Sequence, residues 1–297
     1  MYQEERDSLS AFMTESGKSQ GQVAKETGLS TSVISQFLKG IYTGDNQKIA
    51  QTIKQYLAVG MERLQSKQAV NFYSDLVNTQ QVLFAVRYAH TNCKMSLVSG
   101  DSGAGKTTAL KHYADNNTGV IFVTANECSD TPMSILSLIC DQLGKESPKR
   151  RNALMKLLVS QLTGTNWLII IDEADHLSLD ALQAIRNLND QAKVGIVLSG
   201  NDKIYRQMLT SRRGYEFDQL RTRITVRKKV YNDYSCEEMA GIFPQLNDEC
   251  LGFMLSFANY ESLRGAKELY DIALKYAVVK NSSFTLKLLE NTRLQMQ

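Results

Sequence analysis

The chain has 297 residues, a net charge of +3, 43% hydrophobic residues and 22% charged residues. This length suits two or three domains, and the composition is typical of globular proteins and excludes extensive disorder. No apolar run approaches the ~20 residues that cross a bilayer, and the polar start of the chain has no signal segment. We therefore expect a cytoplasmic protein without a membrane partner, whose five cysteines are reduced thiols because none has a metal-binding spacing.

Residues 1–60 have a helical pattern that contains the features of a helix-turn-helix. Ala24 allows two helices to approach closely, Gly28 permits a tight turn, and Ser30 is suited to cap the second helix. The outer face of this second helix offers polar side chains to a major groove, namely Thr31, Ser32, Ser35, Gln36 and Lys39. We expect a DNA-binding domain here, and the alternative is a helical packing or protein-contact module.

The rest of the chain divides into three segments. Residues 61–80 are polar and weakly patterned, which is typical of a linker or of an exposed helix. Residues 81–230 alternate between short apolar runs and longer amphipathic stretches, which predicts an α/β fold with a parallel sheet and crossover helices. The expected strands are residues 94–99, 120–124, 167–171 and 194–199. Residues 231–297 have apolar residues at three- and four-residue intervals and predict a small helical domain.

Residues 100–107, GDSGAGKT, match the phosphate-loop pattern G-x-x-x-x-G-K-[ST] between a candidate strand and a candidate helix. The glycines let the backbone curl with its N–H groups turned inward, and the following helix presents its positive end to phosphates. Lys106 supplies a charge to the outer phosphates, and the Thr107 hydroxyl is suited to ligate Mg²⁺. We expect the nucleotide to contact Gly100, Asp101, Ser102, Gly103, Ala104, Gly105, Lys106, Thr107 and Thr108.

Two polar clusters follow the next buried strands. The apolar run 167–171 ends in Asp172 and Glu173, at the sheet edge that carries the phosphate loop. Asp172 is placed to hold Mg²⁺ and Glu173 to orient or deprotonate water; on their own, the two acids are also typical of a helix-capping cluster. Asn201 follows the strand at 194–199 and is suited to hydrogen-bond the water, or is a turn asparagine. We assign no role to Asp175.

Together these motifs resemble an AAA+ ATPase core, and the resemblance implies ATP and Mg²⁺ as cofactors and a helical lid at 231–297. Asn201 matches the first sensor of that family. Residues 220–224, LRTRI, resemble the segment that carries the arginine finger, which implies that Arg223, or else Arg221, acts on the nucleotide of a neighbouring subunit in a homo-oligomer. Residues 261–269 resemble the second-sensor helix, with Arg264 as its arginine. The alternative for the two candidate finger arginines is that they bind nucleic-acid phosphates.

A basic stripe covers residues 203–229, where nine lysines or arginines stand against two acids. Such a stripe can neutralise DNA phosphates without reading sequence, and the alternative is a solvated face. Arg212 and Arg213 are our candidate DNA contacts within it.

The order of these motifs along the chain resembles the MuB family of transposition proteins, most closely at residues 22–46, 100–108, 168–177 and 194–206. This resemblance implies an AAA+ ATPase that assembles on double-stranded DNA with ATP and with little sequence preference. It further implies that the protein recruits and stimulates a MuA-like transposase and leaves the DNA on hydrolysis. Two alternatives are a replication helicase loader and an ATP-sensing transcription regulator, whereas a metabolic kinase is disfavoured because no acceptor site is evident.

Overall fold

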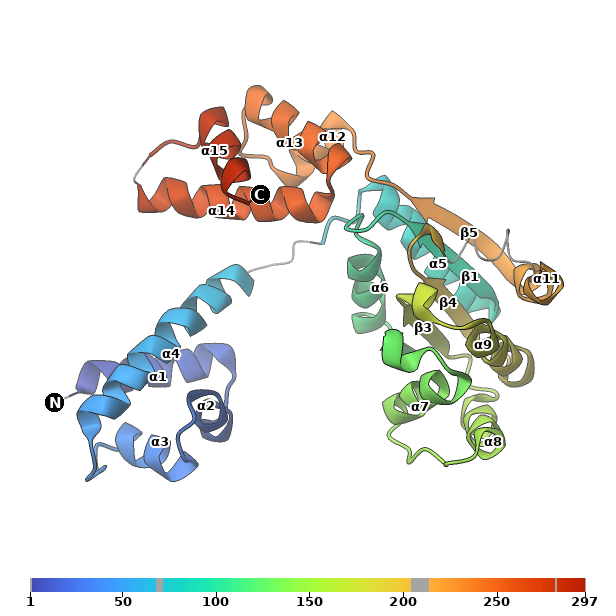
Figure 1. Cartoon of the computed structure of the whole chain (residues 1–297), viewed down its shortest axis with the longest axis horizontal. Helices are drawn as coiled ribbons and strands as arrows, with labels where there is room; N and C mark the ends of the chain where they lie inside the picture. Colours follow the sequence, from blue (N-terminus) through green and yellow to red (C-terminus); the bar gives the residue numbers. More distant parts are fainter. Residues whose placement is uncertain (1, 68–71, 204–213, 281, 297) are drawn as a thin grey trace. The chain divides into compact units, whose positions relative to one another are not determined.

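The computed structural model describes residues 2–67, 72–203, 214–280 and 282–296 (Figure 1). The chain separates into two compact units, Met1–Asn71 and Phe72–Gln297. None of the described helices is long and apolar enough to cross a membrane.

The first unit is a bundle of four helices: α1 (Gln3–Ser16), α2 (Gln20–Thr27), α3 (Thr31–Leu38) and α4 (Asn46–Lys67). Gly28 ends α2 with a left-handed φ of 71°, and the Ser30 hydroxyl caps α3 by accepting from the Val33 N–H. The core between the helices contains Leu9, Phe12, Val23, Ile34, Phe37 and Ile53. Burial of each such side chain stabilises the unit by about 1.5 to 3 kcal/mol.

Helix α4 continues past residue 60, where we expected the N-terminal domain to end and a linker to begin. Residues 61–67 are helical, which agrees with the alternative of an exposed helix for this segment. The reason is that the segment MERLQSK contains good helix formers and neither glycine nor proline, so a helix already under way has no signal to stop. Downstream, Phe72 stacks on His112 with ring centroids 3.5 Å apart, so the second unit begins packing well before residue 81.

The second unit contains a parallel five-stranded sheet in the order β2-β3-β4-β1-β5. Its strands are β1 (Met95–Gly100), β2 (Val120–Thr124), β3 (Leu168–Asp172), β4 (Gly195–Ser199) and β5 (Ile224–Val230). The first four agree with the expected strands to within a residue at each end, and the expected α/β fold class with a parallel sheet is confirmed. Strand β5 was not expected, because its sequence ITVRKKV lies in the basic stripe. It is an edge strand, and charged side chains are common on such strands.

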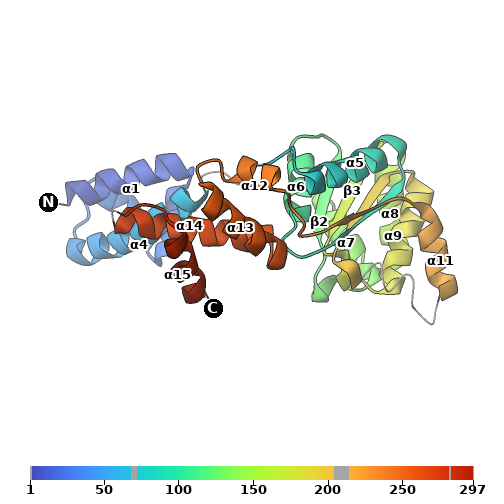
Figure 2. The ribbon, with the colours of Figure 1, turned by 90° about the horizontal axis from the view of Figure 1, so that it is seen from above.

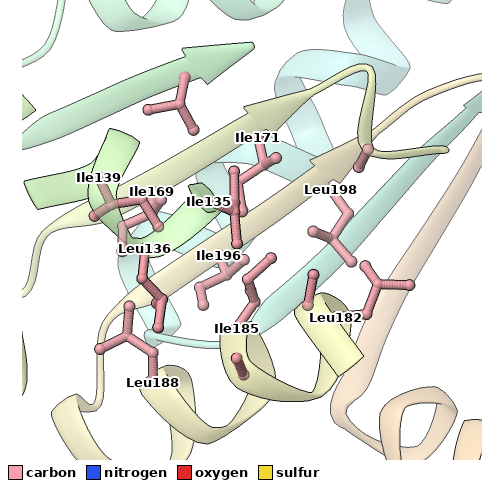
Figure 3. Close-up of a cluster of buried hydrophobic side chains, with 14 of the residues drawn as sticks. Ile135, Leu136, Ile139, Ile169, Ile171, Leu182, Ile185, Leu188, Ile196 and Leu198 are labelled. Carbon is pink, nitrogen blue, oxygen red and sulfur yellow. The ribbon is translucent and has the colours of Figure 1, made fainter. Parts of the chain in front are cut away.

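Helices cover both faces of the sheet (Figure 2). They are α5 (Val77–Asn92), α6 (Lys106–Asp115), α7 (Pro132–Gln142), α8 (Arg151–Leu162), α9 (Leu179–Ala192) and α11 (Gly214–Arg223), with short turns η1 (Glu127–Ser129) and η2 (Ala174–His176). Alternation along β3 explains the two layers. Ile169 and Ile171 pack in the cluster formed with α7, α8 and α9 (Figure 3), while Leu168 and Ile170 pack against α5 and α6. The continuous apolar run of β3 is therefore a strand buried on both faces.

The remaining helices form a lid with its own core: α12 (Cys236–Ile242), α13 (Asp248–Tyr260), α14 (Leu263–Val279) and α15 (Leu286–Met296). The Ser235 hydroxyl and the Glu238 carboxylate cap α12 reciprocally. Leu76, just before α5, belongs to the same buried cluster. The lid is thus attached to the sheet domain both through the chain after β5 and through the segment before α5.

Candidate functional site

The carboxyl ends of β1, β3 and β4 lie at one edge of the sheet, because all three strands are parallel and neighbours in register. The phosphate loop follows β1, Asp172 is the last residue of β3, and Asn201 comes two residues after β4 ends. The fold therefore brings the three expected polar groups to the same edge.

The phosphate loop has the backbone that its glycines permit. Gly100, Gly103 and Gly105 have φ values of 136°, 76° and 89°, which other residues rarely adopt. A Cβ atom on Gly100 would lie 1.8 Å from the carbonyl oxygen of Val230, so β5 also requires glycine at this position. Gly105 is the N-cap of α6, and the free N–H groups of that helix start at the loop. This arrangement forms an anion site without any charged side chain.

Lys106 is folded over the loop. Its Nζ donates to the carbonyl oxygens of Gly100 at 2.9 Å and Asp101 at 2.7 Å. Burial lowers the pKa of Lys106, and the nearby carboxylates of Glu173 and Asp172 act in the opposite direction. A phosphate would give this partly buried ammonium a charged acceptor, which makes a stronger hydrogen bond than a carbonyl.

The residues expected to hold a metal ion are in direct contact. The Thr107 hydroxyl donates to Oδ2 of Asp172 at 2.6 Å, and Asp172 is only 2% exposed. A hydroxyl and a carboxylate are the oxygen ligands that small divalent cations prefer, usually together with water and substrate phosphates. The donor chemistry therefore fits a divalent metal beside a bound nucleotide.

Glu173 leaves β3 in a left-handed conformation, with φ of 54°, and its side chain is exposed. Ligand atoms of Glu173, Asp175 and His176 lie within 4.8 Å of one another. Glu173 is thus held beside Asp172 and the loop, where we expected the water-orienting residue. Its role stays a prediction.

Asn201 contacts Asp175, a residue to which we assigned no role. Its Nδ2 donates to Oδ2 of Asp175 at 2.6 Å, and its backbone N–H donates to Oδ1 of the same carboxylate at 3.1 Å. Sequence reasoning missed Asp175, although a third acid directly after a buried strand was an available signal. The contact connects the ends of β3 and β4.

The start of α14 in the lid lies beside the phosphate loop. A Cβ atom on Gly103 would lie 2.6 Å from Cβ of Ser262 and 3.4 Å from Cβ of Arg264. In addition, Asn232 donates to the Ser102 carbonyl at 3.2 Å and, through its backbone N–H, to the Asp101 carboxylate. The Cβ atom of Arg264 therefore lies beside the loop, as expected of a second sensor. The role of Arg264 stays a prediction.

The two candidate finger arginines lie at the other end of the sheet. Arg223 immediately precedes β5, and its Nε pairs with Oδ1 of Asp190 at 2.9 Å, while Arg221 pairs with Asp218 at 3.3 Å. Because β5 runs parallel to β1, its seven residues put about 20 Å between its amino end and the loop at its carboxyl end. Neither arginine can serve the loop of its own chain, and their action on a neighbour stays a prediction.

The expected DNA contacts are only partly described. Arg206, Arg212 and Arg213 lie outside the described residues. Lys228 sits over the ring of Phe84 at 5.0 Å, and Lys229 pairs with Asp202 at 3.5 Å. In the first unit, Thr31, Ser32, Gln36 and Lys39 are exposed and Ser35 is half-buried.

A phosphate loop and a helical lid that meet at one edge of a parallel sheet are the arrangement of AAA ATPases. A family model described as an AAA domain matches residues 89–208. The chain is an ATPase of this class, with a site for a nucleotide and a divalent metal.

Comparison with curated proteins identifies the family. The ATP-dependent target DNA activator B of Escherichia phage Mu is 33% identical over 213 residues, which cover 70% of this chain and 67% of that protein. The Mu-like prophage FluMu DNA transposition protein B of Haemophilus influenzae is 31% identical over 204 residues, with 67% and 70% covered. The chain therefore belongs to the target DNA activator B family, also called MuB.

Among solved structures, RuvB of Thermotoga maritima aligns with 72% of this chain and 66% of its own, at 15% identity and a TM-score of 0.44. At this low identity and TM-score, the similarity to RuvB carries no information about activity.

Proposed function

We propose that this protein is an ATP-dependent, largely sequence-independent DNA-binding ATPase that prepares target DNA for transposition and recruits a MuA-like transposase. The observation that carries the proposal is its membership of the target DNA activator B family, at 33% identity to the phage Mu protein. The geometry adds support, because the nucleotide-handling residues lie together at one edge of the sheet.

ATP and Mg²⁺ are the proposed cofactors. The loop N–H groups and Lys106 hold the phosphates, while Thr107 and Asp172 hold the metal. When bound, magnesium–ATP supplies the phosphoryl group that is transferred to water and the cation that offsets its charge. Glu173 orients the attacking water and accepts its proton, and the Asn201 amide donates a hydrogen bond at the same edge.

A second copy of the chain completes the site. Arg223, or else Arg221, reaches the nucleotide of the neighbouring subunit, because about 20 Å separates these arginines from their own loop. Their ion pairs with Asp190 and Asp218 involve half-exposed side chains, and such pairs contribute little stability. They can therefore be exchanged for a phosphate at small cost. Bound ATP in this way links subunits into an oligomer or filament.

Double-stranded DNA binds along the basic stripe of residues 203–229 of successive subunits. Contacts to phosphates are individually weak and sequence-independent, and an assembly adds many of them along one duplex. The exposed polar face of α3 is a second candidate DNA contact. Hydrolysis removes the terminal phosphate that joins the subunits, so the assembly dissociates after the transposase has been recruited in the cytoplasm.

Fluorescence anisotropy of labelled duplexes tests this proposal. We expect two unrelated sequences to be bound with similar affinity in a non-hydrolysable ATP analogue and far more weakly in ADP. Lys106→Ala should lose the ATP-dependent binding, whereas Lys111→Ala, which removes an exposed lysine of the same helix, should retain it. Equal binding with and without ATP, or binding confined to one sequence, would contradict the proposal.

A further inference from the structure

We propose that Asp175 is a positioning residue for ATP hydrolysis, whose carboxylate fixes the side-chain amide of Asn201 so that one N–H remains available to the nucleotide site. The inference rests on the proposed function, since it concerns the ATPase reaction of that same site. It assigns a role to a side chain that no sequence motif identified.

Asp175 binds Asn201 at two points. Oδ2 accepts from Nδ2 at 2.6 Å, and Oδ1 accepts from the backbone N–H at 3.1 Å. A carboxylate that accepts two hydrogen bonds from one residue sets both the position of the backbone and the direction of the side chain. Asp175 is 6% exposed, so water competes little for these hydrogen bonds.

The opposite atom of the amide is also engaged. Oδ1 of Asn201 accepts from the backbone N–H of Lys203 at 2.8 Å. If the amide were reversed, its oxygen would face the Asp175 carboxylate and its NH₂ group would face another donor. Only one orientation is therefore compatible with both contacts. In that orientation the NH₂ group uses one hydrogen on Asp175 and keeps the second for another acceptor.

The packing around Gly200 favours the same contact. A Cβ atom on Gly200 would lie 2.5 Å from Oδ1 of Asp175 and 3.2 Å from its backbone nitrogen. Any side chain here would displace the carboxylate from Asn201. The end of β4 is thus shaped to admit Asp175 at the point where Asn201 begins.

The pair lies at the reactive edge of the sheet. Asp175 is two residues beyond Glu173, and ligand atoms of the two side chains lie within 4.8 Å of each other. The charge of Asp175 also acts on Lys106 of the phosphate loop, where it is a minor influence that raises the lysine pKa. A hydrogen bond donated by Asn201 at this edge is consequently close to where charge develops during phosphoryl transfer.

Comparison of the single and double variants of Asp175 and Asn201 distinguishes this proposal from a purely structural role of Asp175. If Asp175 acts through Asn201, removing either residue causes the same loss of turnover, and removing both causes no further loss. If Asp175 only stabilises the fold, its removal lowers stability and leaves the turnover of folded protein unchanged. The effect of removing Asp175 and the effect of removing Asn201 are then independent in the double variant.

The test measures kcat, KM for ATP and thermal stability for Asp175→Asn, Asn201→Ala and the double variant. Asp175→Asn keeps the size of the side chain but replaces one of its two acceptor oxygens with an NH₂ group, so it cannot accept both hydrogen bonds from Asn201. We expect each single variant to lower kcat on the order of 10²-fold, the effect of a misplaced group, with KM and the thermal midpoint close to wild type. The double variant should be no slower than the slower single one. Asp180→Asn, which makes the same change at an exposed position, should retain wild-type turnover.

Gly200→Ala provides an independent variant that alters neither side chain of the pair. It should reproduce the loss of kcat with nucleotide binding retained. Normal turnover of Asp175→Asn beside a slow Asn201→Ala, or losses that multiply in the double variant, would overturn the inference while leaving the proposed function intact. A wild-type protein that fails to hydrolyse ATP with or without DNA would instead overturn the proposed function.

Discussion

The chemistry of this protein depends on a few atoms at the carboxyl edge of its sheet. Glu173 adopts a left-handed φ of 54° immediately after the buried Asp172. Such a conformation costs on the order of 1 kcal/mol or more in a residue with a side chain, so the surrounding structure must maintain it. It turns the Glu173 side chain out of the sheet while Asp172 stays against Thr107. Neighbouring carboxylates can thus serve two different roles.

Glu173→Gln should separate binding from hydrolysis. The amide keeps the size of the side chain but accepts a proton poorly, so we expect kcat to fall by roughly 10² to 10⁴-fold with ATP affinity retained. Complexes with DNA should consequently last longer in ATP than those of wild type. Steady-state turnover and the dissociation rate from labelled duplex measure the two effects, and wild-type turnover would remove Glu173 from the reaction.

For single residues, the sequence could predict those that belong to a motif of fixed spacing. Lys106 and Thr107 belong to one loop, and Asp172 ends a strand whose apolar run is unmistakable, so their meeting could be predicted. The contact between Asp175 and Asn201 joins residues that are 26 apart. It depends on how β3 and β4 align and on the space that Gly200 leaves, and neither is visible in local sequence.

Among the elements, hydrophobic pattern decided what could be predicted. Strands β1, β3 and β4 are buried on both faces, and β2 is an edge strand that alternates buried with more exposed residues, but all four have distinct short apolar runs. Strand β5 is an edge strand whose Arg227, Lys228 and Lys229 conceal its alternation. Residues 61–67 continue helix α4, and their weak pattern could not distinguish a linker from an exposed helix. The expected boundaries between the domains stay predictions.

The lid supplies a prediction about alkaline pH. Tyr234 lies in the lid core at 4% exposure, and burial raises its pKa from 10.0 to about 12. The unfolded chain therefore loses this proton at lower pH than the folded protein does. The resulting stability is complete below about pH 10 and is lost as pH rises through about 12.

Tyr234→Phe removes this titration. From pH 9 to pH 12, wild type should lose on the order of 2 kcal/mol of unfolding free energy relative to the variant. Denaturant unfolding over this pH range measures the difference. Tyr260→Phe is the matched control, because Tyr260 is 81% exposed and its replacement should leave the pH dependence of wild type unchanged. Parallel pH curves for wild type and Tyr234→Phe would contradict the assignment.

At the scale of the whole molecule, the proposed mechanism requires more than one chain. The phosphate loop and the candidate finger arginines lie at opposite ends of β5, and Arg223 pairs with Asp190 of its own subunit. An arginine placed in this way cannot reach the nucleotide of its own chain, so the proposed finger acts on a second copy. Oligomerisation is therefore part of the proposed catalytic mechanism as well as of DNA binding.

Mixing two inactive variants tests action between subunits. Arg223→Ala should keep an intact loop but lack the finger, and Glu173→Gln should bind ATP and supply the finger without hydrolysing. Each alone should turn over ATP slowly, and adding Glu173→Gln to Arg223→Ala should raise the turnover severalfold on DNA. Absence of any gain, with both variants bound to the same duplex, would transfer the role to Arg221 or refute action between subunits.

Electron microscopy of the protein with duplex DNA addresses the central claim, that ATP assembles this chain on DNA. We predict continuous protein coats on DNA of arbitrary sequence with a non-hydrolysable ATP analogue, and bare DNA with ADP or with Lys106→Ala. Bare DNA under every condition, or isolated particles at a single site, would contradict the account.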